Sequence, residues 1–492
     1  MKLIANMFLL FSICFFTNTT YGKSTTASHI QATADTAYIA GHISNNLMSA
    51  FTVEITTGKD LIYHYVGTKK YTIKSDKGGS FKAHIPLHQY AVKTEIFFTN
   101  EGKRLALLSY SYYIEPGDSI YITIDQAGRP MFSGKGAAKF RYKNSIDSLI
   151  KEIRLKYIKE TPVPLNSAIR VRNYFEKVDY VALSQRNILK SYENLISPVM
   201  KTLFEADITG EEMLAKYSAL RTAYFQLPED AEILQLAKQL ENIPLDTVDA
   251  AIKALSKNYT DFLLTMASTE LSFKNKERKN SVKDLYQKLK NKYDGVLRER
   301  AITRYLIGRN SIGEANDDYE TCLRDAIALS ENYLYKDALQ SQLSAFAKKT
   351  EAFNFSLPDT TGKIITLNSL RGKVVLIDFW FTACRPCMDL AKKLHTDVMP
   401  QFNTKDIVFV SINVDEDKTR WLKSVREGKY TASGSVNLFT EGLAFEHPLI
   451  KYYNIQGCPV LLLIDDEGKI FSATPPRDSE GLNALIQRAI GK

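Results

Sequence analysis

Residues 374–387 read VVLIDFWFTACRPC, and this stretch decides the fold of the C-terminal part of the chain. Its first seven residues are apolar or β-branched apart from one acid, which is typical of a buried strand. Residues 388–399 carry a helical pattern, so the two cysteines lie where a strand ends and a helix begins. Two thiols one helical turn apart can open and close a disulfide, so we predict a redox-active dithiol formed by Cys384 and Cys387.

The beginning of a helix favours a negatively charged sulfur. Free backbone N–H groups there stabilise a thiolate at Cys384, and Arg385 adds a positive charge beside it. Cys387 lies inside the first turn and is partly shielded, so one sulfur can attack while the other resolves the mixed disulfide. Zinc sites use the same C-x-x-C spacing but need about four ligands. No second C-x-x-C or C-x-x-H accompanies this one, so we expect no metal.

Three segments in the right order resemble TlpA/ResA-type thioredoxin-like thiol-disulfide oxidoreductases of bacteria. The first is residues 378–380, DFW, followed after three residues by C-x-x-C. The second lies upstream, where FNFSL at 353–357 is followed by Asp359 and two Gly-Lys pairs. The third is YNIQGCPVLLLID at 453–465. The resemblance covers about residues 350–492 and implies an α/β thioredoxin-like fold.

The resemblance implies a role for each matching residue. Cys384 is expected to be the nucleophile and Cys387 the resolving thiol. Asp378 resembles the buried acid beneath the dithiol, whose pKa is raised by desolvation and which accepts the proton of Cys387. Pro459 is expected to be cis, with the backbone before it pairing with an extended substrate strand.

Other residues are expected on the substrate side of the dithiol: Trp380, Arg385, Pro386 and Cys458. Ala383 stands where the family commonly has Trp, and Cys458 stands where Thr or Val usually precedes the cis-proline. A third thiol there could trap Cys384, tune its potential or serve as inert filler. No cofactor is expected beyond the Cys384–Cys387 disulfide.

The N-terminus predicts export. Residues 1–22 combine a short charged start, an apolar core and small residues near Gly22, a pattern typical of a cleaved signal peptide. The mature protein is therefore expected to be soluble in the periplasm of a Gram-negative cell, with membrane association left open. Only four cysteines follow residue 22, so disulfides do not hold the chain together. The net charge of +9 is mild, and no nucleic-acid motif occurs.

Three domains are predicted after the signal peptide, and the fold class is multidomain. Residues 23–136 contain short runs rich in Val, Ile, Tyr and Phe between turn signals, which predict a small antiparallel β-sandwich. Residues 137–349 show apolar residues three and four apart, which predicts an all-α region. Residues 350–492 alternate strands and helices, which predicts a mainly parallel sheet with helices on both faces.

The same patterns predict the bounds of individual elements. One strand is expected at 105–114, and single helices are expected at 246–271, 282–307 and 317–347. The acidic run at 415–417 is expected to cap the next helix rather than to hold a cation.

The leading functional interpretation is a periplasmic thiol-disulfide oxidoreductase that reduces protein disulfides; the sequence leaves the direction, reduction or oxidation, open. The resemblance implies a membrane thiol electron donor and a link to cytochrome c biogenesis. One alternative is a thiol peroxidase, although peroxidatic sites want Thr or Ser three residues before the cysteine and Thr382 is only two before Cys384. The other alternative is a non-catalytic envelope binding protein with a vestigial dithiol.

Overall fold

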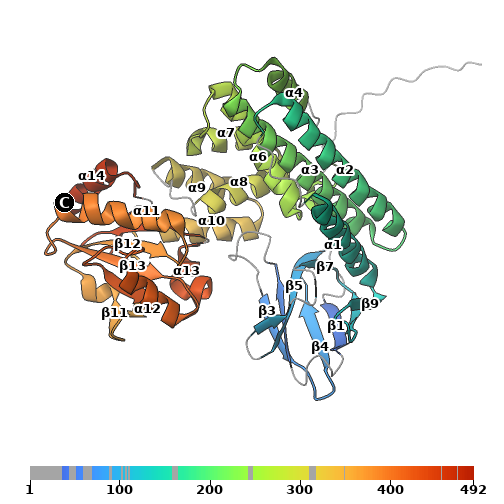
Figure 1. The fold of residues 1–492 in the computed structure, drawn as a ribbon, viewed down its shortest axis with the longest axis horizontal. Coiled ribbons are helices and arrows are strands. Elements are labelled where there is room, and N and C mark those ends of the chain that lie inside the picture. The colour runs from blue at the N-terminus through green and yellow to red at the C-terminus, as the bar shows by residue number, and fades with distance from the viewer. Residues whose placement is uncertain are drawn as a thin grey trace, which may run out of the picture.

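A computed structural model gives the fold and describes most of the chain beyond residue 35. The described residues are 36–43, 51–58, 69–87, 91–100, 103–105, 108, 111–157, 165–241, 248–309, 317–347, 349–455, 457–473 and 475–491. The predicted signal peptide, residues 1–22, lies outside them. Figure 1 shows three groups of elements, in which the helical group contacts both the β-rich group and the C-terminal α/β group.

The N-terminal group consists of two sheets around one core. Its strands are β1 Thr36–Ile43, β2 Thr52–Thr57, β3 Lys69–Lys74, β4 Ser80–Pro86, β5 Val92–Asn100, β6 Lys103–Leu105, β7 Tyr112–Ile114, β8 Ser119–Ile124 and β9 Pro130–Lys135. One sheet has the order β4-β1-β8-β9, and the other has the order β3-β2-β5-β6 with β7 also on β5. Alternate residues such as Ile39 and Phe98 point into the shared core, because strand side chains alternate between faces.

Two expectations for this region are corrected. β1 and β8 run parallel, so the strands here are not purely antiparallel. The chain reaches β8 only after building the second sheet, and a long crossover permits a parallel pairing that a hairpin does not. The single strand expected at 105–114 is divided between β6 and β7, which both pair with β5, a strand the pattern did not reveal.

The middle of the chain is helical. Its helices are α1 Ala137–Tyr157, α2 Ala168–Tyr192, α3 Pro198–Gln226, α4 Ala231–Glu241, α5 Ala250–Lys253, α6 Lys257–Asn275, α7 Val282–Lys292, α8 Gly295–Arg309, α9 Asp317–Leu329 and α10 Tyr333–Phe346. The three long helices expected here are each split in two. Ser256 and Asn332 cap new helices with their side chains, and Gly295, at φ +53°, begins α8. Apolar periodicity continued across these breaks, so it could not reveal them.

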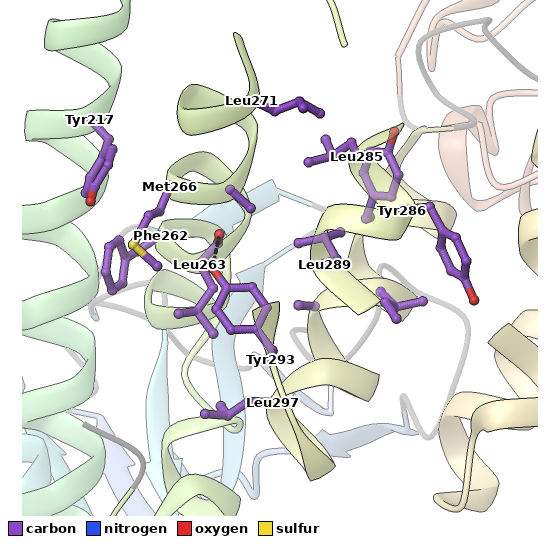
Figure 2. Close-up of a cluster of buried hydrophobic side chains, with 14 of the residues drawn as sticks. Tyr217, Phe262, Leu263, Met266, Leu271, Leu285, Tyr286, Leu289, Tyr293 and Leu297 are labelled. Atoms are coloured by element: carbon purple, nitrogen blue, oxygen red, sulfur yellow. Dashed lines mark hydrogen bonds between the residues drawn. The ribbon is translucent and has the colours of Figure 1, made fainter. Parts of the chain in front are cut away.

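The helical core is rich in tyrosine, and several of its hydroxyls are hydrogen-bonded, among them that of Tyr293 (Figure 2). The hydroxyl of Tyr293 donates to the carbonyl of Leu263 at 2.7 Å, and that of Tyr217 donates to the carbonyl of Leu240 at 2.6 Å. A buried hydroxyl without a partner would oppose folding, so these bonds allow large aromatic side chains to fill the core.

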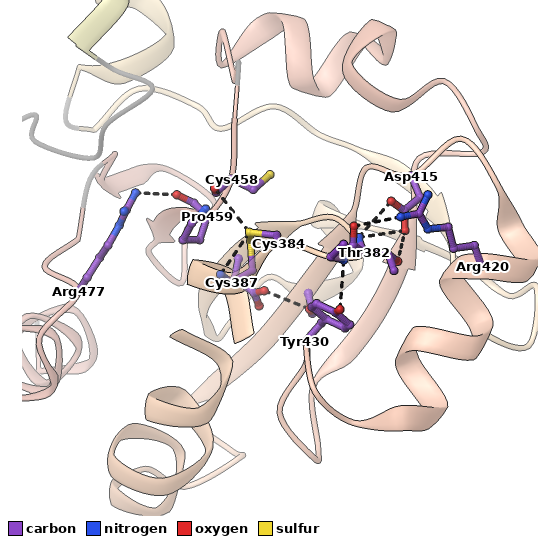
Figure 3. Close-up of a disulfide and its surroundings, with 12 residues drawn as sticks. Thr382, Cys384, Cys387, Asp415, Arg420, Tyr430, Cys458, Pro459 and Arg477 are labelled. Carbon is purple, nitrogen blue, oxygen red and sulfur yellow. Dashed lines mark hydrogen bonds between the residues drawn. A yellow bond between two sulfur atoms is a disulfide. The ribbon is translucent and has the colours of Figure 1, made fainter. Parts of the chain in front are cut away.

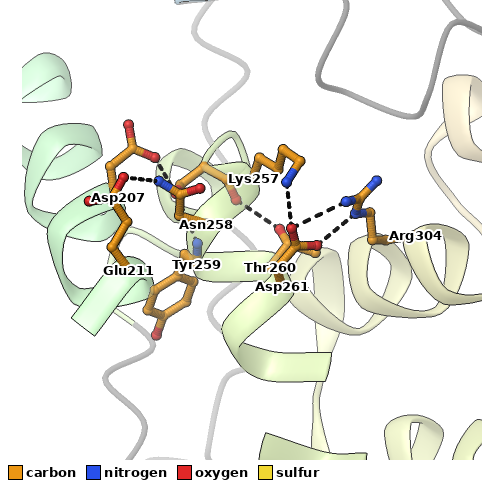
Figure 4. Close-up of polar contacts among 9 residues, drawn as sticks. Asp207, Glu211, Lys257, Asn258, Tyr259, Thr260, Asp261 and Arg304 are labelled. Atoms are coloured by element: carbon orange, nitrogen blue, oxygen red, sulfur yellow. Dashed lines mark hydrogen bonds and ion pairs between the residues drawn. The ribbon is translucent and has the colours of Figure 1, made fainter. Parts of the chain in front are cut away.

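Polar side chains tie α3, α6 and α8 together (Figure 4). Asp261 of α6 binds Arg304 of α8 at 2.8 Å and Lys257 at 2.6 Å. Burial alone would raise the pKa of Asp261, but the hydrogen bonds and charges of these two cations hold it below its ordinary value. Glu211 of α3 accepts a hydrogen bond from Asn258 at 2.9 Å.

The C-terminal group combines a central β-sheet with helices. Its elements are β10 Ser356–Pro358, β11 Ile364–Thr366, β12 Val374–Trp380, α11 Arg385–Lys393, β13 Ile407–Asn413, α12 Lys418–Glu427, β14 Val436–Phe439, α13 Pro448–Tyr452, β15 Val460–Ile464, β16 Ile470–Ser472 and α14 Ser479–Ile490. The central sheet has the order β14-β13-β12-β15-β16. β12, β13 and β14 pair in parallel, whereas β15 pairs antiparallel with both β12 and β16, so the sheet is mixed.

The two faces of β12 meet different helices. Val374 and Leu376 pack with Leu390 of α11 and Leu482 of α14, whereas the intervening residues pack with α13. Because strand side chains alternate, Asp378 falls on the same face as Val374 and Leu376, the face that carries α11. In the part of the chain that the structure describes, no helix is long and apolar enough to cross a membrane.

The helical region is joined to the α/β group just ahead of Pro459. Asn454, 3% exposed and at φ +46°, donates from Nδ2 to the carbonyl of Ile307 at 3.2 Å. Ile307 lies in the last turn of α8, where carbonyls have no partner within the helix. Nearby, the rings of Phe346 and Tyr453 lie 5.8 Å apart.

We expect Asn454→Ala to lower the free energy of unfolding by about 1–3 kcal/mol, because it leaves a buried carbonyl without its donor. Both variants lose the amide, but alanine also tolerates the positive φ of this position poorly, so Asn454→Gly, which has no β-carbon, should lose less. Urea unfolding followed by tryptophan fluorescence measures both, because the two tryptophans, Trp380 and Trp421, lie in the α/β group. Equal stability of the wild type and the two variants would contradict a stabilising role of the hydrogen bond between Asn454 and Ile307.

Candidate active site

The two cysteines form a disulfide at the beginning of α11 (Figure 3). Cys384 is the N-cap residue, and the backbone N–H of Cys387 donates to its Sγ at 3.2 Å. Their Cα atoms are 5.3 Å apart, and each residue is 3% exposed. A helix N-terminus stabilises negative charge, so the geometry favours a thiolate on Cys384 once the disulfide opens.

The two residues between the cysteines are at the surface. The side chain of Arg385 is 80% exposed and lies 3.5 Å from Asp389. Pro386 is exposed and occupies the first turn, where its missing N–H has no helical partner to lose. Just before the motif, Ala383 has φ +75°, a left-handed conformation that is unfavourable for a residue with a β-carbon. The backbone of this loop must therefore be held by its neighbours.

Asp415 holds the loop, a role that the sequence did not reveal. Both its carboxylate oxygens accept from the backbone N–H of Thr382, at 3.1 and 3.2 Å, and one also accepts from the threonine hydroxyl. That hydroxyl lies 2.8 Å from the hydroxyl of Ser424. The expectation that the acidic run caps the next helix holds for Asp417, which accepts from Thr419 and Arg420, but is wrong for Asp415.

Two aromatic rings pack against the loop that contains Ala383. Trp380 stacks on Tyr430 with ring centres 5.1 Å apart, and the tyrosine hydroxyl accepts from the backbone N–H of Ala383 at 3.1 Å. Trp380 is 0% exposed. The structure therefore places it as packing for the dithiol loop and not at a surface that a substrate can touch.

The loop around Pro459 lies against the dithiol. The Cys458–Pro459 peptide bond is cis, and the carbonyl oxygen of Cys458 lies 3.7 Å from Cys384 Sγ. Arg477 donates to the carbonyl of Pro459 at 2.6 Å. Burial, together with the negative charges of Asp378 and Asp415, raises the pKa of the Cys458 thiol. It therefore stays protonated near neutral pH and is a poor nucleophile. A redox role for Cys458 stays a prediction.

Asp378 supplies a titratable carboxyl on the face of β12 toward α11. Burial raises its pKa to about 7, against the opposing effect of a hydrogen bond from Ser411 Oγ at 3.1 Å. Ser411 stands directly opposite it on β13. A carboxyl with this pKa can both accept and release a proton near neutral pH. Among the described residues, no group of three His, Cys, Asp or Glu is placed to hold a metal.

Known proteins are similar to the C-terminal part of the chain. The thioredoxin-like family profile matches residues 372–470. The thiol-disulfide oxidoreductase ResA of Bacillus subtilis is 30% identical over 141 residues, which cover 28% of this chain and 73% of that protein. ResA of Bacillus cereus is 28% identical over 120 residues, covering 24% of this chain and 65% of that protein. The crystal structure of a thioredoxin domain of a thiol-disulfide oxidoreductase from Bacteroides vulgatus is 26% identical, with a TM-score of 0.27, and the match covers 30% of this chain and 99% of that domain.

The C-terminal fold and the dithiol at its helix N-terminus define a thioredoxin-like thiol-disulfide oxidoreductase. The relatives that match this chain over most of their own length are ResA proteins. The chain belongs to the ResA-type family of these enzymes, through its C-terminal part.

Proposed function

We propose that the protein reduces disulfides of other proteins in the periplasm. The observation that carries this proposal is the position of the disulfide. Cys384 caps α11 and lies beside the cis-Pro459 loop. The preceding strand, β12, carries Asp378, whose pKa is about 7. The periplasmic location rests on the signal-like residues 1–22, and the ResA relatives, which are named thiol-disulfide oxidoreductases, support disulfide exchange as the chemistry.

In the reduced enzyme, the Cys384 thiolate attacks one sulfur of the substrate disulfide. The substrate S–S bond breaks, a mixed disulfide with Cys384 forms, and the departing substrate thiolate takes up a proton. Cys387 then gives its proton to Asp378 and attacks Cys384 Sγ. The mixed disulfide breaks, the second substrate thiol leaves with a proton, and the enzyme holds the Cys384–Cys387 disulfide with two fewer electrons.

Regeneration needs a thiol donor that returns two electrons to the dithiol. The proposal assigns this step to a membrane thiol donor, with cytochrome c biogenesis as the process served. Protein substrates fit the site because the cis-Pro459 loop offers backbone groups that an extended strand can pair with.

Insulin reduction by the protein lacking residues 1–22, with dithiothreitol as electron donor, tests the proposal. We expect catalysed precipitation of the insulin B chain, and its loss in Cys384→Ser. Peroxide consumption that depends on Cys384, without insulin reduction, would support the peroxidase alternative instead. Inactivity of both proteins toward both substrates would support the binding-protein alternative.

A further inference from the structure

A groove runs beside the dithiol, between α11 and the loop at 428–434. Its volume is about 680 Å³, within the range of about 300–1,000 Å³ in which proteins hold ligands. Side chains that line it include Arg385, Met388 and Lys392 from α11 and Lys429, Thr431 and Ser433 from the loop. The mechanism described above uses none of these side chains.

The groove lies next to the buried cluster that contains the reactive disulfide. Met388 and Val425 line it and also pack against the buried cluster that contains Cys384 and Cys387. Arg385, which also lines the groove, directly follows the attacking cysteine. A substrate whose disulfide lies on Cys384 can therefore place its neighbouring residues in this groove.

The charge of the groove is mainly positive. Arg385, Lys392 and Lys429 line it against one acid, Asp389. The pairs Arg385–Asp389 at 3.5 Å and Lys429–Glu427 at 3.4 Å are long and largely exposed. Exposed pairs of this kind contribute little, so the cations can turn to a carboxylate of a bound segment.

We propose that this groove binds an acidic segment of the substrate protein next to the disulfide that Cys384 attacks. The inference rests on the proposed function and names its substrate class. Arg385 directly follows Cys384, and Lys392 lies seven residues further along α11, about 10 Å along the helix. An extended peptide covers about 10 Å in three residues. We therefore expect the acidic side chains about three positions from the substrate cysteine.

The test uses three nonapeptides whose central cysteine carries mercaptoethanol as a mixed disulfide. The residues three positions before and after it are Asp, Gln or Lys. We expect kcat/KM of the reduced enzyme to be about tenfold higher for the Asp peptide than for the Lys peptide at 20 mM salt. The ratio should fall to about twofold at 500 mM salt, because exposed charges are screened.

A variant with reversed charge in the groove tests whether these lysines select the peptide. The double variant Lys392→Glu/Lys429→Glu is expected to prefer the Lys peptide. Lys393→Glu/Lys423→Glu is the matched control, because it makes the same change in net charge at positions outside the groove lining. The control should keep the wild-type ratio.

The outcomes separate this inference from the proposed function. Equal kcat/KM for the three peptides overturns the groove assignment while leaving reduction itself in place. An equal shift in the control and the groove variant also overturns it, because long-range charge would then explain the preference. A wild-type enzyme that reduces none of the peptides overturns the proposed function and this inference with it.

Discussion

Replacing Cys387 with serine is expected to stop turnover and to trap the substrate on the enzyme. Cys384 keeps its place at the N-terminus of α11 and still attacks, but the thiol that resolves the mixed disulfide, 5.3 Å away (Cα to Cα) in the wild type, is gone. Internal resolution benefits from a high effective concentration, so insulin reduction should fall by at least about a thousandfold. Non-reducing gel electrophoresis should show a covalent complex that a reductant releases.

Cys384→Ser is the matched control for this experiment. It should be equally inactive yet form no covalent complex, because Cys387 lies inside α11 and not at the N-cap position that Cys384 occupies. Trapping by both variants, or by neither, would contradict the assigned order of attack. Cys322 is buried and its thiol pKa is raised to about 11 by burial, so it should not contribute a trapped species.

Asp378→Asn is expected to slow turnover at pH 8 on the order of a hundredfold, because the variant cannot accept the proton of Cys387. The wild-type rate should rise with pH through about 7, the pKa of Asp378, and this inflection should vanish in the variant. Ser411→Ala serves as the control. Its hydroxyl donates to the carboxylate and lowers the pKa, so removing it should move the inflection to higher pH. An unchanged inflection in Asp378→Asn would exclude this carboxyl as the base.

The same residue makes stability depend on pH. The pKa of Asp378 is about 7 in the folded protein and about 4 in the unfolded chain. Between these values only the folded state keeps the proton, so stability falls as pH rises from about 4 to about 7. Asp378→Asn should therefore be more stable than wild type at pH 8, by up to about 4 kcal/mol, and should match it at pH 4. Thermal unfolding at the two pH values measures the difference, and a stability difference between variant and wild type that is the same at both would contradict the raised pKa.

Local sequence was sufficient for the strand, the dithiol and the helix, because each of these features is encoded within a few residues. The apolar run at 374–380 and the cysteines after it predicted β12 and the beginning of α11. Apolar periodicity was less informative elsewhere. It ran through Ser256 and Asn332, whose caps divide the predicted helices, and it missed β5, because strand pairing is not visible in one strand alone.

The chain by itself determined a dithiol at a strand-to-helix junction and hence the class of chemistry, since both follow from neighbouring residues. Only the tertiary structure decided what holds and surrounds that dithiol. Asp415 and Tyr430 reach the loop from 33 and 47 residues away, and Asn454 meets Ile307 across 147 residues. Contacts of this kind arise when distant segments pack together, so no local pattern records them.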